Sequence, residues 1–324
     1  MKFKAVLTER GRRALDRAFL PTLEKFGKTC QLLLSPTETH VVVPPDHADG
    51  ALIVAKMATN VLFAEGTLVC SSKCNDYIAF STDTAVLIRV LRNLHDNDCE
   101  TIEMKLTNRA TAVPNTSDTI RKPYLSFYGT GVNVNVVQDV EISRPFKPGD
   151  VEALVDQINA GDLCDFYLDL LPEVSRLSVV LERLRSISPA LSLSATHEGD
   201  LHLQARSSGV SLGAEISGID VRPDSVASTA RPLREDTAEG RLREAKALGQ
   251  AVSAEVNLRH VKRALDAAPL TVPMQMLCGI NPHAGVVHIM FAYADPNASD
   301  MQLDESLDLA MKLPLTVSAE EDDD

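Results

Sequence analysis

The predicted secondary structure of this chain repeats once, about a proline-rich break at residues 142–150. On each side of the break, alternating and 3.6-residue hydrophobic periods give a strand, a helix, several strands, a second helix and more strands. The prolines and the glycine of ISRPFKPGD interrupt both periods. The halves share no visible sequence identity, so the repeat is one of pattern. Two halves of this kind predict an α+β fold in which antiparallel sheets pack against segregated helices.

Helical periods occur twice in each half, at residues 9–26, 82–95, 172–187 and 257–267. The strand candidates of the first half are residues 1–8, 28–35, 38–44, 51–57, 101–107, 124–129 and 133–140. Those of the second half are residues 165–171, 190–196, 201–206, 208–216, 272–278, 286–293 and 306–313. We therefore expect two similar domains, each built from antiparallel sheets and two helices.

Domain boundaries follow from the same pattern. The first domain is predicted at residues 1–141, a connector at 142–161 and the second domain at 162–317. Residues 218–248 are rich in Pro, Ser, Thr, Arg and Glu, which predicts a long mobile insertion in the second domain. Residues 318–324, SAEEDDD, are predicted to be a solvated acidic tail.

Composition is typical of soluble globular proteins. The chain has 324 residues, of which 44% are hydrophobic and 24% charged, enough to bury a substantial core. No apolar run reaches the ~18 residues needed to cross a bilayer, and the first residues lack the apolar core of a signal peptide. We expect neither secretion nor a membrane partner.

The metal-ligating residue types do not form a convincing site. The six cysteines are scattered and several lie in apolar stretches, as buried thiols in a reducing compartment do. Cys70 and Cys74 could suggest zinc, but no second ligand pair follows them. The polar stretch from His95 to Glu100 lacks the glycine and the distal glutamate of a calcium loop. We predict no metal, no cofactor and no disulfide framework.

Catalytic motifs are equally weak. The segment from Gly129 to Gly131 is too short for a phosphate or dinucleotide loop, and no GxGxxG sequence surrounds it. Cys30 lies within a predicted strand among leucines, where a buried thiol is expected rather than a nucleophile. Because no motif stands in its proper structural context, an enzyme is the least favoured class of function.

Charge is divided unevenly between the predicted helices and the rest of the chain. The four helical segments together carry 13 Arg or Lys and 7 Asp or Glu, a net charge of +6. The whole chain has a formal net charge of −13, which leaves −19 on the remaining residues. A charged outer face is ordinary for one amphipathic helix in water. Here, however, four helices share a sign that the rest of the chain opposes.

At 100° per residue, most of the positive helical charge lies away from the apolar stripes. The arginines predicted to face outward are Arg10, Arg13, Arg17, Arg89, Arg92, Arg176, Arg183, Arg259 and Arg263. Arg176 and Arg183 are expected on the flank of their stripe, and Lys262 near an apolar edge. This pattern predicts a basic surface made by the helices.

A basic surface on an acidic body suits a polyanion such as nucleic acid, because the acidic remainder repels the polyanion elsewhere. Contacts to phosphates would be independent of sequence and sensitive to salt. The chain has no Trp and only 4% aromatic residues, so it offers few platforms for stacking unpaired bases. The backbone of duplex DNA is therefore the predicted ligand of the nine arginines.

Five segments, taken in order, resemble a known family. They are MKFKA at the start, KTCQLLLSP at 28–36, IEMKLTN at 102–108, LPEVSRLSVVLERLRSIS at 171–188 and GDLHLQA at 199–205. Their order and spacing resemble the Hus-one family, the hydroxyurea-sensitivity subunit of the heterotrimeric DNA-damage checkpoint clamp. A weaker match follows at KLPL near the end. Each segment is part of a framework rather than a catalytic signature.

The resemblance implies a clamp fold similar to that of the proliferating-cell nuclear antigen, with sheets outside and four helices per subunit lining a central hole. It implies a non-enzymatic nuclear protein that forms a ring with two other clamp subunits and encircles DNA at damage sites. A clamp loader would place the ring, which would recruit checkpoint kinase activators and repair enzymes. Edge strands near residues 101–140 and 286–313 would join the subunits by strand addition. A self-assembling replication clamp of the same fold is the alternative.

Three features depart from the family pattern. Pro21 lies inside the first predicted helix, where it removes a backbone donor and is expected to kink or shorten the helix beyond Leu20. That expectation makes a channel role for Lys25 doubtful. The insertion at 218–248 is longer than the family pattern, and the acidic tail is additional.

Overall fold

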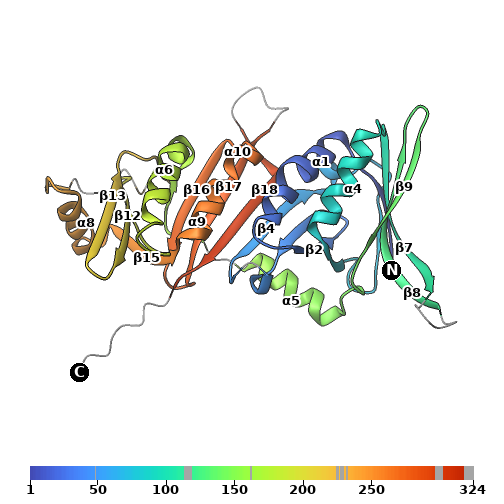
Figure 1. Ribbon diagram of the computed structural model, residues 1–324, viewed down its shortest axis with the longest axis horizontal. Coiled ribbons are helices and arrows are strands. Elements are labelled where there is room, and N and C mark those ends of the chain that lie inside the picture. Colours follow the sequence, from blue (N-terminus) through green and yellow to red (C-terminus); the bar gives the residue numbers. More distant parts are fainter. Residues whose placement is uncertain are drawn as a thin grey trace. The chain divides into compact units, whose positions relative to one another are not determined.

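A computed structural model describes residues 1–47, 49–112, 119–160, 163–223, 226, 230, 233–295 and 302–316. The chain forms two compact units, Met1–Ala160 with Glu305–Leu309 and Gly161–Asp304 with Ala310–Asp324. Antiparallel sheets and helices build each unit (Figure 1). The predicted α+β class is therefore confirmed. The acidic tail at 318–324 lies outside the described residues.

The strands of the first unit fall into two antiparallel groups. One group is a five-stranded sheet in the order β5-β1-β7-β8-β9, and the other runs β4-β3-β2-β6. Their bounds are β1 Lys2–Val6, β2 Thr29–Leu34, β3 Glu38–Val43, β4 Leu52–Ala58, β5 Val69–Ser71, β6 Ile78–Asp83, β7 Thr101–Ala112, β8 Thr119–Thr130 and β9 Asn135–Glu141. The hydrophobic periodicity of the sequence did not predict β5, which has only three residues, or β6, which runs directly into a helix.

The helices of the first unit include the two predicted ones, two further α-helices and a 3₁₀ turn among the described residues. Their bounds are α1 Glu9–Arg13, the π-helical turn η1 Ala14–Phe19, α2 Leu20–Glu24, the 3₁₀ turn η2 Pro45–His47, α3 Thr59–Leu62, α4 Thr84–Asp96 and α5 Pro148–Asn159. The segments α1, η1 and α2 join end to end and form what is called the first helix below. Apolar side chains of the first helix, α4 and both groups of strands meet in one core, among them Leu15, Leu32, Val41, Leu87, Leu91 and Phe127.

The first helix is not shortened at Pro21, because it continues to Glu24. A proline inside an α-helix lacks a donor and presses on the carbonyl four residues back. The π-helical turn just before Pro21 shifts the bonding pattern, so that the Leu20 N–H donates to the Leu15 carbonyl five residues back. Pro21 then takes an early position in α2, where a proline is tolerated.

The segment predicted as a connector contains helix α5, which packs on the first unit. Val151 and Leu154 of α5 are buried against Leu33, Val42 and Ala79 of the group β4-β3-β2-β6. This is the face of those strands opposite the core with the first helix and α4. Both faces of the group are therefore covered, which explains why its strands are apolar on both sides.

The second unit repeats the plan with its own two groups of strands. One runs β14-β10-β16-β17-β18, and the other is a four-stranded sheet in the order β13-β12-β11-β15. The strand bounds are β10 Tyr167–Asp169, β11 Ala190–Thr196, β12 Leu201–Ser207, β13 Val210–Ile216, β14 Val221–Arg222, β15 Ala251–Asn257, β16 Gln275–Asn281, β17 Val286–Ala294 and β18 Leu303–Pro314. The helix bounds are η3 Leu171–Glu173, α6 Val174–Leu184, α8 Ala238–Ala247, α9 Leu258–Leu265 and α10 Ala268–Thr271.

The core of the second unit lies between the helix pair α6 and α9 and the two groups of strands. Its members include Leu177, Leu181, Leu193, Leu201, Val261, Leu265 and Ile289. The leucines of β11 and β12 alternate with polar residues that face the other way, as expected for a sheet buried on one face. Across the described part of the chain, no helix is both long and apolar enough to span a membrane.

The insertion predicted at 218–248 is not structureless throughout, because it contains helix α8. Thr237 caps the helix by accepting a hydrogen bond from the Gly240 N–H at 3.1 Å. Arg241 of α8 forms an ion pair with Glu215 of β13, and its Nε–H donates to Glu215 Oε1 at 3.2 Å. The hydrophobic periodicity of the sequence did not predict α8, because this highly charged helix has no apolar stripe. Within the insertion, residues 224–225, 227–229 and 231–232 lie outside the described residues.

Candidate nucleic-acid interface

The four helices predicted from the sequence form one pair in each unit: the first helix with α4, and α6 with α9 (Figure 1). Side-chain caps fix where three of them begin. The capping oxygens belong to Thr8, Asp83 and Asn257, which accept from the backbone N–H of Gly11, Val86 and Arg259 at 2.9, 2.9 and 3.0 Å. Because caps set the start and buried apolar stripes set the rotation, the outward side chains of each helix are fixed.

Most of the predicted interface residues reach the surface. Seven of the nine are exposed, namely Arg13, Arg17, Arg89, Arg92, Arg176, Arg183 and Arg259. Arg10 and Arg263 are half-buried. The structure places five of the nine on the helix pair of the first unit and four on the pair of the second.

In the first unit, two of the arginines lie at the seam between the helices. Arg92 Nε of α4 lies 3.5 Å from Asp16 Oδ1 of η1. Arg17 Nη2 of η1 lies 3.1 Å from His95 Nε2 of α4. These cross-helix contacts draw both guanidinium groups onto one outward face. The carboxylate Asp16 is itself buried and helps to hold Arg92 there.

The start of the first helix carries a further arginine that the sequence did not single out. Glu9 Oε2 lies 2.6 Å from Arg12 Nη2, and its Oε1 lies 2.8 Å from Arg13 Nε. Desolvation would raise the pKa of Glu9, but hydrogen bonds and charge from the two arginines outweigh it and lower that pKa. Glu9 therefore stays ionised and neutralises part of the positive charge at this end.

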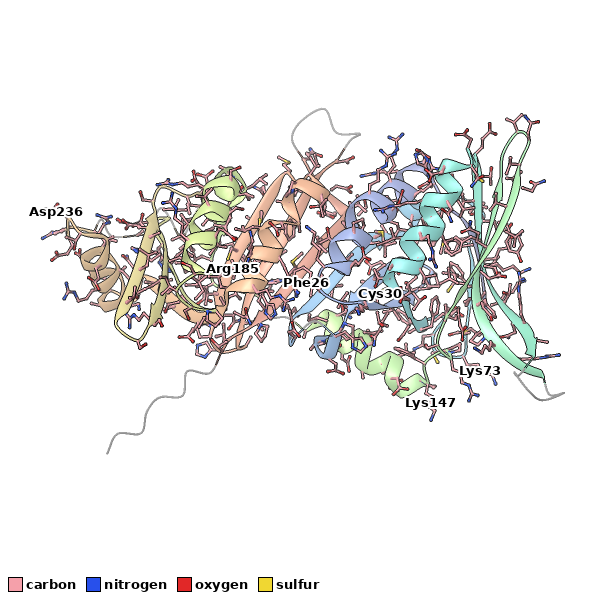
Figure 2. All side chains as sticks on the ribbon, viewed as in Figure 1. Phe26, Cys30, Lys73, Lys147, Arg185 and Asp236 are labelled. Atoms are coloured by element: carbon pink, nitrogen blue, oxygen red, sulfur yellow. The ribbon has the colours of Figure 1, made fainter. Side chains whose placement is uncertain are left out.

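In the second unit, a single carboxylate links the two helices. Glu182 of α6 lies 3.2 Å from Lys262 Nζ of α9 and 3.4 Å from Nη1 of Arg185, which Figure 2 labels. Arg176 of α6 pairs at 3.6 Å with Glu173, the last residue of the preceding turn η3. The sequence placed Lys262 near an apolar edge, and the structure gives it a half-buried position against Glu182.

Arg89 and Arg183 are the strongest candidates for contact with phosphate. Both are exposed, and among the described residues neither guanidinium group forms an ion pair or hydrogen bond. Arg259 is also exposed at the start of α9. In contrast, Arg263 is half-buried, and its Nη1 is shielded from solvent. Exposed ion pairs contribute only about 0–1 kcal/mol, so phosphates can still compete for the paired arginines.

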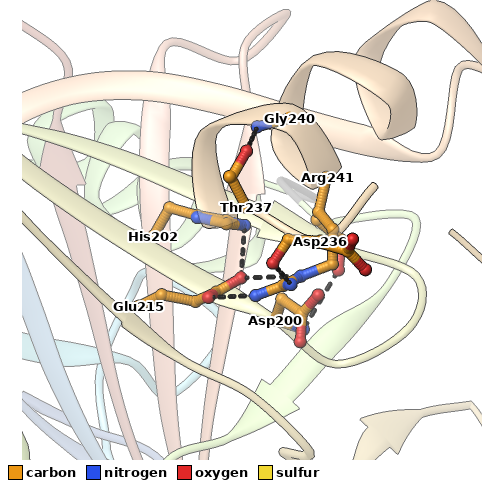
Figure 3. Close-up of polar contacts among 8 residues, drawn as sticks. Asp200, His202, Glu215, Asp236, Thr237, Gly240 and Arg241 are labelled. Atoms are coloured by element: carbon orange, nitrogen blue, oxygen red, sulfur yellow. Dashed lines mark hydrogen bonds and ion pairs between the residues drawn. The ribbon is translucent and has the colours of Figure 1, made fainter. Parts of the chain in front are cut away.

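The polar cluster beneath α8 contains three residue types that can ligate a metal ion. Ligand atoms of Asp200, His202 and Glu215 lie within 4.8 Å of one another (Figure 3). The guanidinium of Arg241 occupies the space beside Glu215 that a cation would take. Burial lowers the pKa of His202, whereas burial and then the charge of Glu215 raise the pKa of Asp200. A metal could bind these three residues only by displacing Arg241, so the cluster acts as an anchor for α8.

The cysteine thiols give no support to nucleophilic catalysis. Burial raises the pKa of Cys30 to about 11 and that of Cys278 to about 12, so neither forms a thiolate near neutral pH. All six cysteines are free thiols. Cys70, of the pair considered for zinc, donates instead to the Asp76 carbonyl at 3.1 Å.

Comparisons with known sequences identify the family. The family model described as Hus1-like protein matches residues 1–303. A Drosophila melanogaster protein described as checkpoint protein Hus1-like is 24% identical over 222 residues, which cover 64% of this chain and 72% of that protein. A Dictyostelium discoideum checkpoint protein hus1 homolog is 24% identical over 224 residues, covering 68% of this chain and 75% of its own.

Comparisons with solved structures identify the fold. The proliferating cellular nuclear antigen of Entamoeba histolytica aligns with 97% of this chain and 98% of its own, with a TM-score of 0.55 at 11% identity. The corresponding protein of Thermococcus kodakaraensis aligns with 97% of this chain and all of its own, with the same TM-score and identity. The chain therefore belongs to the Hus1-like protein family and is a non-enzymatic checkpoint clamp subunit with the fold of a sliding clamp.

Proposed function

We propose that this chain is one of three different subunits of a ring that encircles duplex DNA at sites of damage. The outward arginines of the four helices would line the hole and contact phosphates of both strands. The observation that carries this proposal is the placement of exposed arginines on both helix pairs of a chain whose net charge is −13. Such a surface attracts a polyanion to the helices and repels it from the rest of the chain.

Free strand edges support the assembly of a ring. β9 ends the five-stranded sheet, and β13 ends the four-stranded sheet of the second unit. Apolar side chains are exposed there, with Val137 of β9 at 55% and Val210 of β13 at 52%. Two different edges on one chain suit a head-to-tail ring in which each subunit adds a strand to the next.

The contact expected near residues 286–313 needs correction. β17 lies between β16 and β18, so both of its edges are already paired. Its backbone donors and acceptors are used within the sheet and cannot join another chain. β13 takes the place of β17 in the proposal, whereas the edge at β9 falls within the predicted range 101–140.

The remaining partners follow from family membership and are part of the same proposal. A closed ring must be opened to reach DNA, which calls for a clamp loader. Checkpoint and repair proteins would bind the ring once it is in place, and the nucleus is the compartment in which such a ring would act. Neither a catalytic activity nor a membrane partner belongs to the proposal.

Charge reversal at Arg89 and Arg183 tests the interface. The double variant Arg89→Glu, Arg183→Glu should weaken retention of the assembled ring on closed circular duplex DNA by at least tenfold, because two phosphate contacts become repulsive. The slope of log affinity against log salt should fall by about 2, since each lost phosphate contact removes ~0.9. Both residues are exposed, so the unfolding midpoint should stay the same.

Arg206→Glu provides the matched control. Arg206 is exposed on β12, and its side chain lies on the face of the sheet that does not contact α6 or α9. It should leave retention and the salt slope unchanged. Equal losses in the double variant and the control, or no loss in either, would exclude the helical surface as the DNA contact.

The self-assembling replication clamp remains the second candidate, because the sliding-clamp structures cover nearly the whole chain. Mass measurement of the purified chain separates the two. A stable homotrimer would favour the replication clamp. A species that forms a ring only after two different clamp-like chains are added would favour the heterotrimer.

A further inference from the structure

Helix α8 covers only part of one face of the sheet β13-β12-β11-β15. That sheet buries its other face against α6 and α9 (Figure 1). The ion pair between Arg241 and Glu215 holds α8 to β13 (Figure 3). At the end of the helix, the Gln250 N–H donates to the Ala245 carbonyl at 2.8 Å and ties α8 to the start of β15. Beside the helix, the described residues leave a groove of about 810 Å³ over the sheet, called the α8 groove below.

The floor of the α8 groove consists mainly of small side chains. Ser192 of β11, Gln204 of β12 and Gly213 of β13 are paired across the sheet, and all three line the groove. Arg206 Nη2 donates to Gln204 Oε1 at 2.9 Å, and Gln204 Nε2 donates to Ser211 Oγ at 2.9 Å. These bonds orient the Arg206 guanidinium along the floor. The floor therefore presents one oriented positive charge among small polar groups.

Gly213 shows that the floor is open for a reason other than local packing. It lies within β13, and its φ is outside the left-handed region. A Cβ built there would lie 3.6 Å from the Leu203 carbonyl oxygen, which is an ordinary contact distance. Neither the backbone nor the neighbouring atoms therefore require a glycine. A glycine inside a strand weakens it, and it often marks a place where another backbone approaches closely.

One face of α8 forms the wall of the groove. Glu239, Leu242, Arg243 and Lys246 stand at helical positions i, i+3, i+4 and i+7, so they share a face, and all four line the groove. The charged groups of Arg243 and Lys246 are exposed, and neither forms an ion pair or hydrogen bond among the described residues. Leu242 is half-buried between them and the start of the helix. The wall thus offers two cations and one apolar contact.

The α8 groove is basic although the chain is acidic. The cations of its lining are Arg206, Arg243 and Lys246. The carboxylates of its lining are Glu215 and Glu239, and the ion pair with Arg241 neutralises Glu215. Three cations therefore face one remaining carboxylate, in a chain whose net charge is −13. Such a site attracts anionic groups that the rest of the surface repels.

We propose that the α8 groove binds an extended acidic segment of a partner protein. Arg243 and Lys246 supply charge-assisted hydrogen bonds to its Asp or Glu side chains, and Arg206 supplies another from the floor. Leu242 packs against an apolar side chain of the segment, and the small floor residues admit its main chain. The volume lies within the ~300–1,000 Å³ of typical binding clefts. Because the groove lies on the face opposite α6 and α9, the proposal does not depend on what the helices bind.

Binding of a labelled peptide to the full-length chain tests the proposal. The probe is a fluorescein-labelled peptide of aspartates around a single leucine, and its Kd is measured by fluorescence anisotropy. The double variant Arg243→Glu, Lys246→Glu should raise the Kd at least tenfold, because two attractive charges become repulsive. The matched control is Lys73→Glu, Lys147→Glu, which makes the same change in charge at two exposed lysines of the first unit (Figure 2). It should leave the Kd within about twofold.

Gly213→Leu tests the floor without a change in charge. The added side chain would fill the floor, so the Kd should rise at least threefold while the urea unfolding midpoint stays the same. In the double variant, amides of α8 should exchange as in the natural chain, since Arg241 still anchors the helix. These two measurements separate lost binding from lost structure.

Four results would overturn the proposal. The first is a peptide that does not bind the natural chain, or that binds as well when asparagine replaces aspartate. The second is a Kd that changes equally in the double variant and in its lysine control, or in neither. The third is protection from hydrogen exchange that the bound peptide gives to α6 and α9 rather than to α8 and β13. The fourth is a duplex oligonucleotide that loses as much affinity in the double variant as the peptide does, which would make nucleic acid the ligand of the groove.

Discussion

The strand group under α5 and the strand group under α8 hold equivalent places in their units but bind their helices by opposite chemistry. α5 is held by apolar contacts, in which Val151 and Leu154 pack on Leu33 and Val42. α8 is held by the ion pair between Arg241 and Glu215, beside a buried histidine. The same arrangement of strands can therefore hold a covering helix either by apolar contacts or by polar ones.

The sequences of the strands explain this difference. β2 and β3 are apolar on both faces, whereas β11 reads ALSLSAT and alternates. Small polar residues on the α8 side leave a groove of about 810 Å³, with Ser192, Ser194, Ser211 and Gly213 in its lining. The hydrophobic pattern of a strand therefore indicates how many of its faces are covered.

The largest effect is expected from placing a polar side chain on the apolar face that packs against α5. Leu33 is 1% exposed, and Leu33→Ser would leave a cavity and a buried hydroxyl under α5. We expect a loss of about 3–5 kcal/mol in the free energy of unfolding, measured by urea denaturation.

The reverse change in the other group is its control. Ser192 is half-buried and lines the open groove, so Ser192→Leu should alter the free energy of unfolding by less than about 1 kcal/mol. Similar losses from both substitutions would mean that the two helices are held in the same way.

A local effect is expected from breaking the polar anchor. Arg241→Met removes the partner of Glu215, so amides of α8 should exchange at least tenfold faster while those of α5 keep their rates. Arg243→Met, on the same helix and exposed, is the control and should change neither. If α8 stays protected without Arg241, the anchor assigned to the ion pair is wrong.

The smallest effect is a pH dependence from His202. Burial lowers its pKa below the ordinary 6.5, and the charge of Glu215 opposes this only in part. Protonation therefore favours the unfolded chain: the stability contribution is full above pH 6.5 and is lost as the pH falls through the folded-state pKa. Arg241 and Lys246 also face this histidine and disfavour its protonation.

His202→Gln isolates that contribution. The free-energy difference between the natural chain and the variant should shrink as the pH is lowered from about 7.5 to about 5, because only the natural chain gains a buried charge. His40 and His197, whose pKa values burial also lowers, are present in both and cancel. A difference that stays constant over this range would contradict the assignment.

Local periods predicted most of the elements that carry the candidate interface. The four paired helices lie close to their predicted positions, since each buries one apolar stripe such as Leu87 and Leu91 of α4. The exposed positions of Arg89 and Arg92 follow directly from that stripe. The half-burial of Arg263 could not be predicted in this way, because it depends on neighbours that are distant in sequence.

The α+β repeat, the register of the helices and the sign of their outward charge could be predicted from the sequence, because these follow from periodic burial within single elements. The sequence did not predict that a π-helical turn carries the first helix through Pro21, that α5 and α8 each cover a sheet, or that Glu182 joins α6 to α9. Contacts of this kind join residues far apart in the chain, and no local period records which elements will meet.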